Sequence, residues 1–257
     1  APPLFHASLN RERGTRGLPP IGRIFDHVVE SGRLFLAADE AILPVPPDVR
    51  ALARAPLDVT PTWILDEPAA PQPELDRLLA TPGPPLVYVG FGSMVHGNRA
   101  RLARLIREAG AFAGVRIVLG TGWSGLTAAD APPGAVVLGD VSHAAVFPRL
   151  AAVVHHGGAG TMATAARAGV PQVVVAHLGD QHYHGWRLHE LGVAPPPLFE
   201  RMISARALGA AIREAVANGG YREKARALGE TIGGTNGAPA AAEILERNTS
   251  GPERPRR

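Results

Sequence analysis

One short stretch of the chain has the residue types and the spacing of a phosphate-binding turn. Residues 155–161 read His-His-Gly-Gly-Ala-Gly-Thr, after the apolar run Ala151 to Val154 and before a helical segment of small residues, Met162 to Ala168. Glycine lets the backbone approach an anion closely, and the first unpaired N–H groups of a helix point at it. We expect His156 to donate a hydrogen bond to a phosphoryl oxygen. We expect Thr161 to cap the helix and still offer its hydroxyl.

A glycine-rich turn alone is weak evidence for a ligand, because a tight strand-to-helix connection has the same pattern. Similar polar or glycine residues follow four other short apolar runs, at Gly92-Ser93, Gly120 to Trp123, Asp140 to His143 and His177 to Gln181. Continuous apolar strands that alternate with helices predict a parallel sheet buried on both faces. Such sheets bind ligands at the carboxyl ends of their strands. The five strand ends together therefore predict a phosphate-bearing ligand.

Length and composition narrow the class of protein. The 257 residues suffice for one large domain or somewhat more, and 46% hydrophobic residues allow a sizeable core. The formal net charge is only +3 and the arginines are scattered, so nucleic acid is not required as a partner. The absence of cysteine excludes disulfides and thiolate metal sites and suits a reducing cytoplasm. The sequence shows no apolar run long enough to span a membrane and no signal peptide pattern, so we expect a cytoplasmic protein.

The sequence predicts four regions. Residues 1–60 read as irregular, with one helix over Arg23 to Glu30 and a short strand over Arg33 to Ala37. Residues 61–85 hold seven prolines and predict a stiff linker with one helix, Glu74 to Ala80. Residues 86–247 form the regular α/β domain, and 248–257 a disordered tail. Within that domain we expect strands over 86–91, 115–119, 135–138, 151–154 and 173–176, and helices over 99–113, 143–150, 159–168, 181–191, 204–216, 221–232 and 238–247, with Ser204 and Asn236 as caps.

These residues resemble the donor-binding half of GT-B glycosyltransferases, in the bacterial group similar to sterol glucosyltransferases and antibiotic glycosyltransferases. The resemblance runs from about Pro61 to Arg247 and is carried by five motifs, 87–94 (Val-Tyr-Val-Gly-Phe-Gly-Ser-Met), 140–143 (Asp-Val-Ser-His), 155–161, 167–171 (Arg-Ala-Gly-Val-Pro) and 179–181 (Gly-Asp-Gln). It implies a Rossmann-like parallel sheet flanked by helices, the C-terminal domain of the GT-B fold. The first 60 residues resemble the end of the family's acceptor-side N-terminal domain, so we expect them to be a remnant of it.

The resemblance also implies a role for each motif. His156 is expected to contact the diphosphate, which Gly158, Gly160 and Thr161 cradle. Ser93 is expected to approach a phosphate, Val141 and His143 to hold the base and ribose, and Asp180 and Gln181 to bond the sugar hydroxyls. Fixed hydrogen-bond donors stabilise the charge that develops on the leaving diphosphate, so we expect no metal and no cofactor beyond the nucleotide-sugar substrate.

Three departures from the family pattern affect the expected activity. Thr164 stands where many relatives have a Glu that binds the ribose, and His184 stands where relatives often have a Trp. The motif of the family's general base, a His of the N-terminal domain, is not found in this sequence. We therefore expect the chain to bind UDP-glucose or a dTDP-sugar without transferring the sugar efficiently to a small-molecule acceptor on its own. A partner chain that supplies the acceptor half is a further possibility.

Three other functions fit parts of the sequence. His177, Asp180, His182 and His184 could hold zinc or iron in a hydrolase, but this leaves the glycine turn unexplained. The simpler interpretation of His182, His184 and His189 is exposed helix residues, and that of His155 is a packed residue with its hydrogen bonds made. A nucleotide-sugar epimerase would share the architecture and use Asp180 for proton transfer. A non-catalytic subunit that binds nucleotide sugar is the third. Trp123 either walls the ligand site or anchors a loop.

Overall fold

The computed structural model describes residues 3–24, 26–27, 34–52, 57–65, 70–94, 98–123, 125–139 and 141–249. The chain forms two compact units. The larger unit comprises Ala41–Leu43 and Ile64–Thr235, and the smaller unit comprises Ala1–Glu40, Pro44–Trp63 and Asn236–Arg257. This grouping differs from the predicted ranges, and it divides residues 61–85, the predicted linker, between the two units after Trp63. Residues 41–43 join the larger unit because Ile42 is buried in its core, and the last helix joins the smaller unit.

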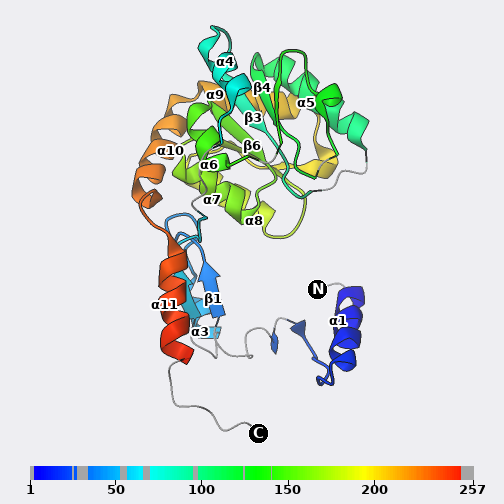
Figure 1. The fold of residues 1–257 in the computed structure, drawn as a ribbon, viewed down its shortest axis with the longest axis vertical. Coiled ribbons are helices and arrows are strands. Elements are labelled where there is room, and N and C mark those ends of the chain that lie inside the picture. Colours follow the sequence, from blue (N-terminus) through cyan, green and yellow to red (C-terminus); the bar gives the residue numbers. More distant parts are fainter. Residues whose placement is uncertain are drawn as a thin grey trace. The chain divides into compact units, whose positions relative to one another are not determined.

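A six-stranded sheet forms the centre of the larger unit (Figure 1). Its strands are β3 (Leu86–Val89), β4 (Arg116–Gly120), β5 (Val136–Leu138), β6 (Ala152–His155), β7 (Gln172–Ala176) and β8 (Leu198–Phe199). The order is β5-β4-β3-β6-β7-β8, and every neighbouring pair is parallel, as the apolar runs predict. The chain proceeds outward from β3 in one direction and from β6 in the other. The strand order therefore reverses between β3 and β6, which is where open parallel sheets place their ligand crevice.

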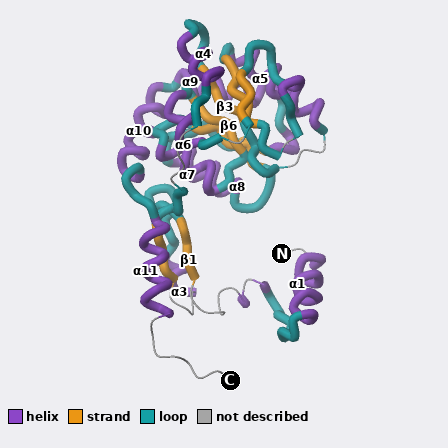
Figure 2. Tube along the Cα trace, viewed as in Figure 1, coloured by secondary structure: helices purple, strands orange, loops and turns teal. Residues whose placement is uncertain are grey.

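Helices cover both faces of this sheet, as Figure 2 shows. They are α4 (Pro73–Ala80), α5 (Arg99–Ala113), α6 (His143–Val146), α7 (Ala159–Arg167), α8 (Gln181–Glu190), α9 (Ala205–Ala217) and α10 (Gly219–Ile232). Successive side chains of a strand point to opposite faces of the sheet, and both faces are apolar. Val87 and Val89 of β3 pack with residues of α5 and α9, whereas Leu86 and Tyr88 pack with residues of α4 and α6. Because both faces are buried, the strands read as continuous apolar runs.

The predicted helix over 143–150 is divided in the structure. α6 ends at Val146, and a 3₁₀ turn covers Phe147–Arg149. Pro148 accounts for the break, because proline has no N–H group to continue the α-helical ladder. Both predicted caps are confirmed: the Ser204 hydroxyl accepts from the N–H of Ala207 (3.1 Å), and Asn236 Oδ1 accepts from the N–H of Ala238 (3.0 Å).

The smaller unit has more regular structure than its prolines suggest. It contains α1 (Pro3–Thr15), β1 (Leu34–Ala37), α3 (Pro47–Leu52), β2 (Leu57–Thr60) and α11 (Gly237–Thr249). β1 and β2 pair in parallel, and the N–H of Gly237 donates to the Thr62 carbonyl (3.2 Å). The prediction of an irregular segment was wrong for α1 and α3. Each begins at a proline, because the first helical position needs no N–H donor.

Two predicted features fall partly on residues that the structure does not describe. Of the helix over 23–30, residues 25 and 28–30 lie outside the described residues. The tail over 248–257 is described only at 248–249, which end α11 and are therefore not the disordered residues that we expected. In the described part of the chain, no helix combines the length and the apolar character needed to cross a membrane.

Candidate functional site

The glycine-rich turn connects β6 to α7 at the reversal of the strand order. Gly158 is the N-cap of α7 in an extended conformation, and the first intrahelical bond runs from the N–H of Met162 to the Gly158 carbonyl (2.9 Å). The N–H groups of residues 159–161 come before that bond, so they are available to an anion. We had expected Thr161 to cap the helix, but it is the third residue of α7. Its hydroxyl has no hydrogen-bond partner among the described residues.

The side chain of His156 is enclosed by two glycines. Only 8% of the residue is exposed. A Cβ at Gly92 would lie 2.9 Å from Cε1 of the ring, and a Cβ at Gly158 would overlap Nε2. Nδ1 of His156 is buried and has no partner in the part of the chain that the structure describes. Burial lowers the pKa of His156, His177 lowers it further and Asp180 opposes them, so the neutral ring is favoured.

A cavity of about 370 Å³ lies beside this turn, at the carboxyl ends of β3, β4 and β5. Three residues predicted from the sequence line it: Ser93, Val141 and His143. The other lining residues are Tyr88, Gly92, Thr121, Gly122, Trp123 and Gly139. Trp123 is 73% exposed, so it forms a wall of the cavity and does not anchor its loop in the core. Gly92 lines the cavity and also lies against the His156 ring, so the cavity and the glycine turn are neighbours.

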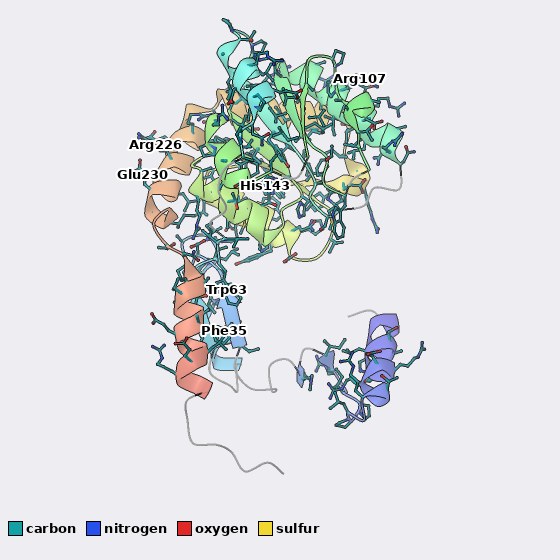
Figure 3. The ribbon with its side chains drawn as sticks, viewed as in Figure 1. Phe35, Trp63, Arg107, His143, Arg226 and Glu230 are labelled. Atoms are coloured by element: carbon teal, nitrogen blue, oxygen red, sulfur yellow. The ribbon has the colours of Figure 1, made fainter. Side chains whose placement is uncertain are left out.

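His143, labelled in Figure 3, is held by two aromatic neighbours. Its Nε2 lies 3.1 Å from the hydroxyl of Tyr88, and its ring stacks on Phe147 with 4.7 Å between centroids. Tyr88 is buried, and burial raises its pKa to about 12. A Cβ at Gly90 or at Gly120 would overlap the Tyr88 ring. The two glycines thus make room for a buried hydroxyl that fixes the orientation of His143.

The loop after β7 presents its two predicted residues differently. Asp180 is exposed at the N-cap of α8. Gln181 is buried, and its Oε1 accepts from the N–H groups of His177 (2.8 Å) and Leu178 (3.2 Å). Both acceptor positions of the amide oxygen are occupied by the loop. The amide nitrogen donates one N–H to Met94 Sδ (3.7 Å), so only its second N–H can serve a ligand.

The histidines of α8 are not the exposed residues that the simpler interpretation predicted. His184 is buried and its Nδ1 donates to the Gly157 carbonyl (2.8 Å), while His189 Nδ1 donates to the Ala194 carbonyl (3.1 Å). The His182 ring packs against Phe199. The expectation was wrong because α8 packs against β7 and α7, which buries His184 and partly covers His182 and His189. No group of three or more His, Asp or Glu side chains within the described ranges is arranged to hold a metal ion.

The predicted residues thus occupy one edge of the sheet in three groups: the cavity, the glycine turn and the loop after β7. Gly160 is exposed with open space around it, and Asp140 lies outside the described residues. His155 is packed and has its hydrogen bonds made, as expected. Sequence reasoning missed the contribution of Tyr88, although the glycines at 90 and 120 were a signal that a large side chain lies across the strand ends.

Comparison with known proteins gives a family match over more than half of the chain. The model of the family described as "Erythromycin biosynthesis protein CIII-like, C-terminal domain" matches residues 104–249. The glycosyltransferase GtfE of Amycolatopsis orientalis is 36% identical over 250 residues, which are 94% of this chain and 56% of that protein. The vancomycin aglycone glucosyltransferase of the same organism is 38% identical over 248 residues, covering 92% of this chain and 55% of that protein. The chain spans about half the length of the curated relatives it matches.

Solved structures give the same picture of the fold. The spinosyn forosaminyltransferase SpnP superposes with a TM-score of 0.66 at 16% sequence identity, over 97% of this chain and 62% of that protein. The sequence relatives also include sterol 3-beta-glucosyltransferases of fungi, among them that of Komagataella phaffii.

Proposed function

Because the chain belongs to the family of erythromycin biosynthesis protein CIII-like C-terminal domains, we propose that it is the donor-binding half of a glycosyltransferase. The proposed reaction transfers a sugar from a nucleoside diphosphate, UDP-glucose or a dTDP-sugar, to a hydroxyl group of a lipophilic natural product or sterol. The predicted α/β fold, that of a GT-B C-terminal domain, is confirmed by the parallel sheet and by the structural neighbours.

One observation supports this proposal most strongly. The glycine turn, with its available N–H groups, its unpartnered Thr161 hydroxyl and the ring of His156, lies where the strand order reverses. The 370 Å³ cavity begins at the next strand, on the other side of Gly92. A nucleoside diphosphate needs these two parts side by side, an anion site for its phosphates and a recess for its nucleoside. A tight strand-to-helix turn without a ligand does not account for a cavity beside it.

In the proposed reaction the acceptor oxygen attacks the anomeric carbon, and the bond from that carbon to the distal phosphate oxygen breaks. The nucleoside diphosphate leaves with the bonding electrons, and the acceptor proton passes to a base outside the motifs of this chain. The N–H groups of residues 159–161 and neutral His156 act as fixed donors to the charge that grows on the phosphate. Asp180 accepts from sugar hydroxyls, and Gln181 donates to them through its amide nitrogen. No metal or cofactor is proposed, and the cytoplasmic location stays a prediction.

Calorimetric titration with UDP and with dTDP, each with and without EDTA, tests the donor site. We expect binding that is independent of EDTA and that His156→Ala abolishes. The matched control is His189→Ala, because His189 is a partly buried histidine that lies in the last turn of α8, away from the glycine turn. The proposal is wrong if the folded chain binds neither nucleotide, or if His156→Ala binds both as the unaltered chain does.

A non-catalytic subunit that needs a partner chain is the second candidate. The chain spans 55–56% of the length of the two Amycolatopsis proteins, and the proposal above concerns only this part. The two candidates make the same donor site and differ in whether the acceptor half belongs to the same polypeptide. Tandem affinity purification of the chain from its native cells separates them, because only a separate acceptor subunit would be recovered as a second polypeptide.

A further inference from the structure

The conformation of the glycine turn depends on Gly157, which is buried and has a positive φ of 89°. A side chain is excluded there, because a Cβ would lie 2.9 Å from Val174 Cγ1 and 3.1 Å from the Gln181 carbonyl oxygen. Glycine permits this conformation but does not enforce it, since its backbone has the widest range of allowed angles. Something else must hold the turn in the one conformation that the structure shows.

Two buried histidines bond the backbone on both sides of Gly157. Its N–H donates to Nδ1 of His155 (3.0 Å), and its carbonyl accepts from Nδ1 of His184 (2.8 Å). His155 is the last residue of β6 and is 0% exposed, while His184 lies on α8 and is 5% exposed. The two bonds fix the peptide planes before and after Gly157, and with them both of its backbone dihedrals.

The bonds require opposite tautomers of the two rings. Nδ1 of His155 accepts a hydrogen bond, so the proton sits on Nε2, which donates to Gln172 Oε1 (2.8 Å). A carbonyl can only accept, so the proton of His184 sits on Nδ1. Burial lowers the pKa of His155 to about 3, which keeps the lone pair on Nδ1 available at neutral pH.

We propose that His155 and His184 are positioning residues that hold Gly157 so that His156 and the first N–H groups of α7 face the diphosphate of the donor. This inference rests on the proposed function. His156 directly precedes Gly157, and the helix cap Gly158 directly follows it. A rotation at Gly157 therefore moves the predicted ring donor and the helix N-terminus relative to each other. Neither positioning residue touches the ligand.

The test compares His184→Leu with His184→Asn. Leucine removes the donor, whereas the side-chain amide of asparagine places an N–H close to the position of Nδ1. His189→Leu is the matched control, since His189 is also on α8 and its ring also bonds a backbone carbonyl, that of Ala194. We expect His184→Leu to weaken UDP binding roughly tenfold and to leave uridine binding unchanged, since uridine has no phosphate. We expect His184→Asn to restore most of the UDP affinity and His189→Leu to alter neither ligand.

Equal losses for UDP and uridine would overturn the proposal, because they would show a general loss of structure. So would unchanged UDP affinity in His184→Leu. Amide hydrogen exchange at Gly157, measured by NMR without ligand, provides a readout that does not depend on nucleotide binding. We expect faster exchange in His184→Leu than in His189→Leu, and equal rates would overturn the positioning role. If the unaltered chain binds no UDP while the exchange rates differ as expected, the proposed function fails and the histidine contacts stand.

Long-range ¹H–¹⁵N spectra of the unaltered chain test the tautomers directly. We expect a protonated Nε2 on His155 and a protonated Nδ1 on His184, and the reverse assignment for either ring would overturn the proposal. This measurement remains decisive even if the leucine variant does not fold.

Discussion

At the residue scale, the candidate site depends on buried polar groups whose partners lie inside the protein. His155, Tyr88 and Gln181 all bond other parts of the larger unit, and each lies next to a residue predicted to contact the ligand or is itself such a residue. Unpaired polar groups are costly to bury, so such contacts specify one arrangement of the strand ends.

The hydroxyl of Tyr88 gives the first prediction at this scale. Tyr88→Phe removes the hydrogen bond to His143 and keeps the ring that packs on Phe147. We expect UDP affinity to fall about fivefold, because His143 is no longer held in one orientation. We expect the melting temperature to fall by a few degrees, because a buried hydrogen bond contributes about 1 kcal/mol. Tyr221→Phe is the control, because its hydroxyl bonds Glu214 far from the cavity. Calorimetric titration measures the difference, and equal affinities for the two variants would contradict the role of Tyr88.

The second prediction concerns pH. The pKa of His155 is about 3 in the folded chain and 6.5 for an ordinary histidine, which represents the unfolded chain. Between these values the unfolded chain binds a proton that the folded chain does not. The contribution of His155 to stability is therefore full above pH 6.5 and is lost as the pH falls, at up to about 1.4 kcal/mol per pH unit.

Urea unfolding from pH 7 to pH 5 measures this effect against His155→Asn, which has no titrating ring. We expect the stability of the unaltered chain to fall more steeply with decreasing pH than that of the variant. Parallel curves would show that His155 titrates normally in the folded state.

At the scale of elements, the turn between β6 and α7 combines a fold requirement with a ligand requirement. Gly158 has backbone angles that any residue adopts (φ −63°, ψ 142°), so only the His156 ring excludes a side chain there. Gly160 is surrounded by open space. In the sequence both are glycines of one motif. In the structure, only Gly158 lies where a side chain would overlap another residue.

This difference predicts different results for two matched substitutions. Gly158→Ala displaces the His156 ring, and we expect it to abolish measurable UDP binding. Gly160→Ala meets no atom, and we expect it to leave the melting temperature unchanged or raise it, because alanine favours a helix over glycine by up to about 1 kcal/mol. Calorimetric titration and thermal melting by circular dichroism check the pair. Normal UDP binding by Gly158→Ala would show that His156 does not contribute to the site.

At the scale of the whole molecule, the chain has a larger unit with a parallel sheet and a smaller unit built from both ends of the sequence. The smaller unit brings together the first 63 residues, apart from 41–43, and α11. We propose, as the resemblance implies, that its first part is a remnant of an acceptor-side domain. The roles of both units remain proposals, since the chain spans about half the length of its curated relatives.

The prediction at this scale is binding without turnover. We expect the 257-residue chain to bind UDP and yet show no transfer from UDP-glucose to a sterol or phenol, because its motifs include no general base. A glucosyltransferase assay by mass spectrometry measures product, with the vancomycin aglycone glucosyltransferase and its aglycone as the positive control. Robust turnover by this chain would show that it supplies a base itself.

The sequence by itself determined the parallel α/β class, five of the strands of the larger unit, most of its helices, and the edge of the sheet where the site residues gather. These follow from local signals: apolar runs, helical periodicity and glycine turns act over a few residues. It missed β8, which is only two residues long, β2 of the smaller unit, and the helices α1 and α3 that begin at prolines.

Only the tertiary structure decided which strand ends are neighbours. The reversal of order between β3 and β6 brings Gly92 against His156, and it could not be read from the chain because strand order depends on contacts between distant segments. The same holds for the Tyr88 and His143 pair, 55 residues apart, and for the burial of His184 beneath the turn. Residue types predicted the chemistry of the site, and packing between distant elements decided which groups remain free to perform it.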